Sequence, residues 1–111
     1  MPNITDNISF DTIAREWRCK WSADNDKASL VALQDLLDKY TPAIKAIDGV
    51  NVQRVVCGAC NDFKVIVAVP EPSYGAWAAD AHKPEEDFLA EMKAIEGVSN
   101  VETQTYTLMT M

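Results

Sequence analysis

The sequence is poor in basic residues and in glycine, and each shortage argues against a class of function. Lysine and arginine together number 10 against 17 acidic residues, which gives a net charge of −7. Nucleic-acid binding depends on clustered positive charge, so we expect no nucleic-acid partner. The four glycines form no phosphate-binding loop. No run approaches the ~20 apolar residues of a membrane helix, so we expect no membrane partner.

Cysteine is also scarce, and its number and spacing limit the chemistry. Three cysteines do not provide a disulfide framework for a domain that is 48% hydrophobic. Residues 1–10 have neither a basic start nor an apolar run, so no secretory signal is expected and a reduced, cytoplasmic protein is the default. Cys57 and Cys60 have the spacing of a redox pair, but such pairs normally begin a helix, and a strand is predicted after them. A structural turn with two thiols is therefore favoured, with a redox or disulfide role and a metal site as the alternatives.

What the sequence does contain is an internal repeat with a period of 48 residues. Lys45-Ala-Ile-Asp-Gly-Val50 returns as Lys93-Ala-Ile-Glu-Gly-Val98. Each copy is typical of a helix end, with a lysine in the last turn, a glycine just beyond it and the first valine of a strand. The two copies indicate a duplicated half-domain within one domain of 111 residues.

The pattern along the chain predicts the order β-α-β-β-α-β. Alternation indicates strands over 15–21, 50–57, 63–69 and 98–109, and spacings of three and four indicate helices over about 26–47 and from 84 onward. Residues 71–83 are interpreted as a long loop. We therefore predict an α+β fold of the ferredoxin-like kind, with a four-stranded antiparallel sheet and two helices on one face. Residues 1–12 are predicted to be a flexible arm and 13–111 the domain.

Two helices cover one face of such a sheet, so the other face is a candidate site. It is expected to carry Arg18 and Lys20 on the first strand and Lys64 on the third, and either Tyr106 or the threonine row of 103–107 on the last. The apolar Ile66 among these charges favours packing against a second copy of the chain. A pocket between the two sheets would accept a small anionic or apolar molecule. Cross-strand pairing of the basic residues with Glu16 and Glu102 is the alternative interpretation.

The segment Val55-Val-Cys-Gly-Ala-Cys-Asn-Asp-Phe-Lys-Val65, with the helix, Gly-Val pair and threonine-bearing strand after it, resembles the ligand-sensing domain of Lrp/AsnC-type regulators. That domain belongs to the dimeric α/β-barrel group, which also includes cofactor-free monooxygenases and haem-degrading proteins. The resemblance implies that the turn from Gly58 to Asp62 lies near a small-molecule site. Asn61 stands where the family typically has an acid, and no helix-turn-helix precedes the domain. In the enzymes of the group, Trp, Asn and His surround the cavity, and the resemblance makes Trp77 and His82 candidates for such roles.

These features lead to three functional hypotheses. The first is a homodimeric small-molecule-binding or sensing domain with an anion-accepting cavity and no cofactor. The second is a small cofactor-free enzyme of the same architecture, a monooxygenase or isomerase, with Tyr106, Trp77 or His82 as catalytic candidates. The third is a thiol or metal protein that uses Cys57 and Cys60.

Overall fold

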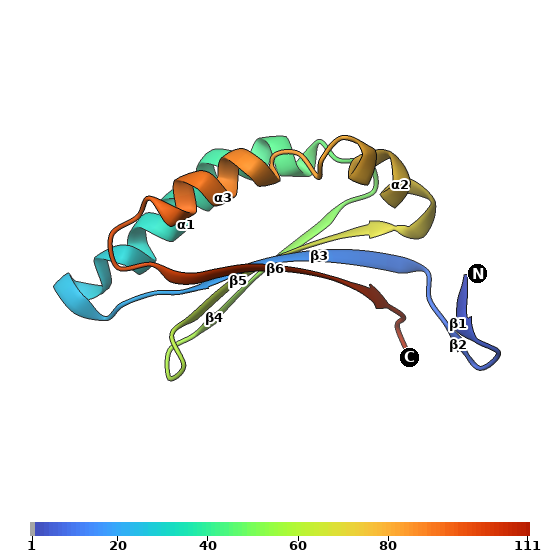
Figure 1. The fold of residues 1–111 in the computed structure, drawn as a ribbon, viewed down its shortest axis with the longest axis horizontal. Helices are drawn as coiled ribbons and strands as arrows, with labels where there is room; N and C mark the ends of the chain where they lie inside the picture. Colours follow the sequence, from blue (N-terminus) through green and yellow to red (C-terminus); the bar gives the residue numbers. More distant parts are fainter. Residues whose placement is uncertain (1) are drawn as a thin grey trace.

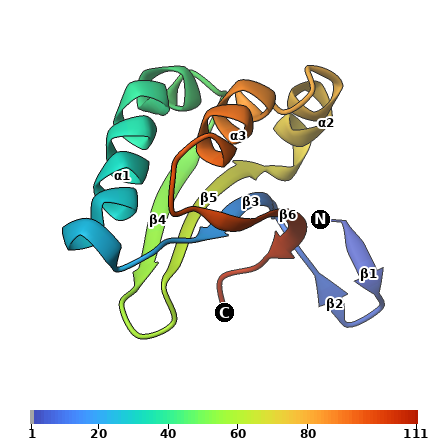
Figure 2. The same cartoon turned by 60° about the vertical axis from the view of Figure 1, so that its left-hand side comes forward.

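The computed structural model describes residues 2–111, which form a helical layer over one face of a four-stranded antiparallel sheet (Figure 1). The bounds of the sheet strands and of the three helices are as follows: β3 (Thr12–Lys20), α1 (Asp24–Lys45), β4 (Asn51–Cys57), β5 (Asp62–Pro70), α2 (Glu71–Ala79), α3 (Glu85–Lys93) and β6 (Ser99–Leu108). A separate hairpin of β1 (Asn3–Thr5) and β2 (Ile8–Ser9) precedes them. It projects beyond the end of the sheet (Figure 2).

The strands of the large sheet are arranged in the order β4-β5-β3-β6. The two central strands, β3 and β5, pair over their whole lengths, from Thr12 opposite Pro70 to Lys20 opposite Asp62. They are the strands that the 48-residue repeat relates to each other. The two halves of the repeat therefore meet at the centre of the sheet.

The core lies between the sheet and the helices. Trp17 and Cys19 of β3 and Trp21 just after it are at most 5% exposed, which confirms the alternation seen in the sequence. Phe88 of α3 packs against Trp17 with the ring centroids 5.2 Å apart. The remaining core side chains come from α1, α2, α3 and β5: Leu33, Leu36, Leu37, Ile44, Phe63, Val65, Val67, Val69, Trp77 and Met92.

The two copies of the repeat have the same conformation. Gly49 and Gly97 have φ angles of +69° and +92°, which a residue with a side chain adopts only with strain. In each copy the valine after the glycine donates its backbone N–H to an isoleucine carbonyl, Val50 to Ile47 and Val98 to Ile95, at 3.2 Å in both. The predicted helix ends are therefore confirmed.

The last strand has an irregularity near its start. The register between β3 and β6 shifts between Arg18 and Lys20, and Asn100 has a positive φ of 52°. Beyond this irregularity Arg18 lies opposite Glu102 and Ala14 opposite Tyr106. Glu102, Gln104 and Tyr106 therefore share the open face, and the threonines face the helices.

The structure corrects two of the expected element boundaries and adds detail to the first helix. Residues 71–79 form the helix α2 and not a loop, because Pro72 and Glu71 suit a first turn and Ala76, Ala78 and Ala79 favour a helix. The first strand of the sheet begins at Thr12, three residues before the predicted start. The helix α1 continues through Pro42, and its opening residues 25–27 have left-handed backbone angles.

No helix within residues 2–111 is long and apolar enough to span a membrane.

Candidate functional site

The open face of the sheet has a mixed apolar and charged surface. Ala14 and Ala68, which lie opposite each other on β3 and β5, are 0% and 8% exposed. Ile66 beside them is half-buried, and Val55 on β4 is 40% exposed. Figure 1 shows no helix on this side of the sheet. These side chains form an apolar strip in which the two alanines are buried and Ile66 and Val55 remain partly exposed.

A hollow of about 260 Å³ lies at one end of this face. Its lining includes three of the predicted site residues, Arg18, Lys20 and Lys64, together with the carboxylates of Asp62 and Glu102. Arg18 and Lys64 lie opposite each other on β3 and β5, which brings the predicted basic cluster together. We call this hollow the sheet-face pocket.

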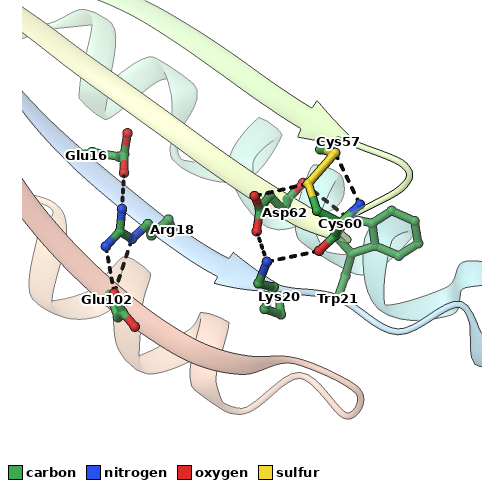
Figure 3. A network of polar contacts seen from close by, with 8 residues as sticks. All are labelled: Glu16, Arg18, Lys20, Trp21, Cys57, Cys60, Asp62 and Glu102. Atoms are coloured by element: carbon green, nitrogen blue, oxygen red, sulfur yellow. Dashed lines mark hydrogen bonds and ion pairs between the residues drawn. A yellow bond between two sulfur atoms is a disulfide. The ribbon is translucent and has the colours of Figure 1, made fainter.

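Two of the three basic residues in the pocket are already paired with acids. Arg18 donates from Nη2 to Glu102 at 2.8 Å and from Nη1 to Glu16 at 3.2 Å (Figure 3). The hydrogen bonding of Arg18 to Glu102 is the main reason that the pKa of Arg18 is raised. Lys20 forms an ion pair with Asp62 and lowers the pKa of that carboxyl group. Cross-strand pairing, the alternative interpretation, is therefore present.

Lys64 differs from the other two cations of the pocket. Among the described residues, no hydrogen bond or ion pair is formed by its ammonium group. It contributes a positive potential that, with Lys20, lowers the pKa of Asp62. Lys64 is therefore the cation of this pocket that is available to a small anion.

Tyr106 lies on the same face and contacts a nearly buried acid. Its hydroxyl donates to Oε1 of Glu16 at 3.1 Å, and Glu16 is 6% exposed. Burial and the negative charge of Glu16 raise the pKa of Tyr106 to about 12. The Tyr106 hydroxyl is therefore protonated at neutral pH and acts as a hydrogen-bond donor.

The turn between β4 and β5 contains a disulfide, which corrects the expectation of two thiols. Cys57 and Cys60 are bonded to each other, and Cys19 in the core is the free cysteine of the described chain. Gly58 is exposed in this turn, away from the lining of the pocket, and Asp62 begins β5 at the edge of the pocket. Of the two turn residues that the resemblance implied, the structure places only Asp62 at the pocket.

The two other catalytic candidates, Trp77 and His82, lie at the opposite end of the molecule, around α2. Their rings are 4.9 Å apart, and Nε2 of His82 lies 2.9 Å from the Tyr74 hydroxyl. Burial and the nearby Arg15 cation lower the pKa of His82, so its imidazole is neutral at pH 7. The structure thus separates these residues from Tyr106 and the basic cluster.

We call Tyr74, Trp77 and His82, with the nearby Glu85, the second cluster. Sequence reasoning missed Glu85, the acid of this cluster that contacts β3. Glu85 accepts hydrogen bonds at 2.7 Å from both Nε of Arg15 and the indole N–H of Trp17. Burial raises the pKa of Glu85, but these hydrogen bonds outweigh it and the pKa is lowered overall. The signal in the sequence was the alternation of β3, which puts Arg15 on the same side of the sheet as Trp17 and Cys19.

Neither cluster is built as a metal centre. Within residues 2–111, no three histidine, cysteine, aspartate or glutamate side chains are grouped in a way that could hold a metal ion.

The fold and the sheet-face pocket define a small α+β protein with a four-stranded antiparallel sheet, three helices and one uncovered sheet face. This fold is shared with two solved structures. One is Rv0793 from Mycobacterium tuberculosis, with a TM-score of 0.65 and 16% identity over 90% of this chain and 97% of that one.

The other is a mutant of SnoaB, a cofactor-independent oxygenase from Streptomyces nogalater, with a TM-score of 0.62 and 14% identity. The structural match covers 96% of the SnoaB chain and 91% of this chain. At these identities the likeness shows the fold alone. No protein-family model matches the chain, and no curated protein matches it. These two structures do not show the narrower resemblance to Lrp/AsnC-type domains.

Proposed function

We propose that the protein is a homodimeric small-molecule-binding module that holds an anion in the sheet-face pocket. The observation that carries this proposal is the position of Lys64 in a hollow of about 260 Å³, where no acid within residues 2–111 forms a hydrogen bond or ion pair with it. A carboxylate or phosphate of a small ligand would supply the missing partner. Charge-assisted hydrogen bonds of this kind are about twice as strong as neutral ones.

The second copy of the chain is proposed because the open face is unsuited to bulk water. Its apolar strip leaves Ile66 and Val55 partly exposed, and Arg18 on the same face is already paired with Glu16 and Glu102. Two such faces packed together would form a dimeric α/β barrel of the ferredoxin-like kind and enclose the pocket between them. The resemblance of the turn to Lrp/AsnC-type sensing domains supports the same arrangement. Residues 1–12 would be a separate arm and 13–111 the binding domain, in the cytoplasm.

The experiment is a thermal-shift titration with benzoate, glutamate and inorganic phosphate. At least one of these anions should raise the melting temperature, and Lys64→Ala should abolish that shift. Lys45→Ala, an exposed lysine at the end of α1, is the matched control and should leave the shift unchanged. Shifts that are absent, or equal in the wild type and both variants, would exclude an anion site at Lys64.

A second candidate function is a cofactor-free monooxygenase or isomerase centred on the other cluster. Two observations favour it: the contact of a neutral His82 with Tyr74 and Trp77, and the fold shared with a cofactor-independent oxygenase. His82 would take a proton from an aromatic or quinol substrate. Oxygen consumption with a quinol, lost in His82→Ala and retained in Lys64→Ala, would favour this function over binding alone.

A further inference from the structure

The disulfide Cys57–Cys60 lies beside the sheet-face pocket and shares contacts with it. Cys60 is exposed and Cys57 is half-buried in the turn between β4 and β5. The sulfur of Cys60 lies 3.2 Å from Oδ2 of Asp62, the carboxylate that pairs with Lys20 (Figure 3). A disulfide carries no proton, so in this state Asp62 receives no hydrogen bond from that sulfur.

Lys20 is held by the same turn. Its ammonium group donates to the backbone carbonyl of Cys60 at 3.0 Å as well as to Asp62. The neighbouring Trp21 fixes the turn further, through its indole N–H to the Asp62 carbonyl at 3.2 Å and its backbone N–H to Asn61 at 3.0 Å. The conformation of the turn therefore determines where the Lys20 cation lies.

We propose that Cys57 and Cys60 form a thiol–disulfide exchange site for small dithiols, and that its redox state controls the Lys20 cation of the sheet-face pocket. The exchange itself stands on the geometry of the turn alone. Its effect on the pocket rests on the proposed anion-binding function.

The positions of the two sulfurs indicate the order of attack. An incoming thiolate reaches the exposed sulfur of Cys60 and forms a new S–S bond to it, and the Cys57–Cys60 bond breaks. Its electron pair goes to the sulfur of Cys57, which accepts the backbone N–H of Cys60 at 3.2 Å and is stabilised as a thiolate. The second thiol of the same dithiol then attacks its own sulfur in the mixed disulfide and releases Cys60. The dithiol is oxidised by two electrons, and its two protons pass to the cysteine thiols.

Reduction changes the partners of Asp62. The new Cys60 thiol is a hydrogen-bond donor 3.2 Å from the carboxylate, where the disulfide offered none. It competes with Lys20 for Asp62, and the opened turn no longer holds the Cys60 carbonyl against the ammonium group. Lys20 then becomes available to the pocket, which strengthens its attraction for an anion.

The exchange is tested by holding the folded protein in graded ratios of reduced to oxidised dithiothreitol, alkylating with iodoacetamide and locating the label by mass spectrometry. Protein purified without reductant should carry no label at Cys57 or Cys60, and under reducing conditions both should become labelled together. Cys19, which is 2% exposed, is the internal control and should remain unlabelled. A pair that is reduced only after urea unfolds the protein, or that is never oxidised, would overturn the proposal.

The control of Lys20 is tested by limited acetylation with an N-hydroxysuccinimide ester in both redox states. Reduction should raise the acetylation rate of Lys20 several-fold and leave Lys64 and Lys45 unchanged. The double variant Cys57→Ser, Cys60→Ser should behave like the reduced form in the presence or absence of dithiothreitol. An unchanged rate at Lys20 would overturn the coupling. None of these measurements uses a pocket ligand, so their failure is distinguishable from failure of the anion-binding proposal.

Discussion

Glu85 is the acceptor for donors from two side chains of β3, and its carboxylate is only 15% exposed. Arg15, which donates to Glu85, also donates to the Thr105 hydroxyl at 2.8 Å. Through Arg15, Glu85 therefore links α3 to both β3 and β6. The neighbouring acid Glu86 is exposed and has no hydrogen bond or ion pair within residues 2–111. The two residues therefore form a natural pair for comparison.

We predict that Glu85→Ala lowers the free energy of unfolding by about 1–3 kcal/mol, because the Trp17 indole and the Arg15 guanidinium lose their acceptor. Glu86→Ala should change it by less than about 0.5 kcal/mol. Urea unfolding followed by tryptophan fluorescence measures both. Equal losses in the two variants would mean that the effect belongs to the helix dipole and not to the buried contacts.

His82 gives a pH dependence of known sign. Its pKa in the folded state is lowered from 6.5, so the unfolded chain takes up the proton first as the pH falls. Stability contributed by the neutral imidazole is present above pH 6.5 and is lost as the pH falls through that value toward the folded pKa. The carboxyl groups with lowered pKa values act in a more acidic range.

We therefore predict that the wild type is less stable at about pH 5.5 than at about pH 7.5, and that His82→Gln reduces this difference. Unfolding in urea at the two pH values measures it. The carboxylates other than Glu85, which interacts with His82, contribute equally to both proteins, so the comparison of the two isolates the effect of His82 and its contact with Glu85. An identical pH dependence in the two proteins would contradict a neutral, partly buried His82.

At the scale of the elements, the repeat made most of the fold predictable. The helix ends at Lys45 and Lys93 and the pairing of β3 with β5 follow from local signals that are strong, namely glycine after a helix and alternation in a strand. The helix α2 was missed because it buries only Trp77 and therefore has no apolar stripe in its sequence. The phase of β6 depended on the irregularity at Asn100, and a single residue there reverses which side chains face the helices.

The role of Gly49 in ending the helix can be tested by comparison with Gly75, which has no such role. A Cβ on Gly49 would lie 2.8 Å from two carbons of Pro70, in addition to the strain of a positive φ. Gly75 lies inside α2 with nothing within 4 Å of such a Cβ. We predict that Gly49→Ala destabilises the protein by more than about 1 kcal/mol, whereas Gly75→Ala stabilises it by about 0.4–1 kcal/mol. Thermal unfolding by circular dichroism measures both, and a neutral Gly49→Ala would show that the turn relaxes freely.

The candidate site was predictable in part, and the limits are physical. The open face and its three cations follow from alternation and strand pairing. Whether each cation is paired depends on side-chain positions across strands that are far apart in sequence, as in Arg18 with Glu102, and periodicity carries no such information. The bond between Cys57 and Cys60 depends in the same way on the geometry of the turn.

At the scale of the whole molecule, the uncovered sheet face determines the expected assembly. We predict that Ile66→Arg, in the apolar strip, converts a dimer to a monomer, because a cation facing its own copy there would be buried without a partner. Val31→Arg is the control, since Val31 is 59% exposed on the outer helical layer. Sedimentation equilibrium measures the mass of each variant. A wild type that is monomeric at high concentration, or an equal loss of mass in both variants, would contradict assembly through the sheet.

The pairing of β3 with β6 places the start of β3 beside the end of β6. Thr12 lies opposite Leu108, so the segments that lead to the two termini leave the sheet at the same end (Figure 1). The protein is therefore suited to circular permutation: a short linker would join the old termini, and new ones would open at an exposed turn without breaking a strand pair. Such a permutant would make β3 and β6 neighbours in sequence, so that the most distant contact of the sheet would form early in folding.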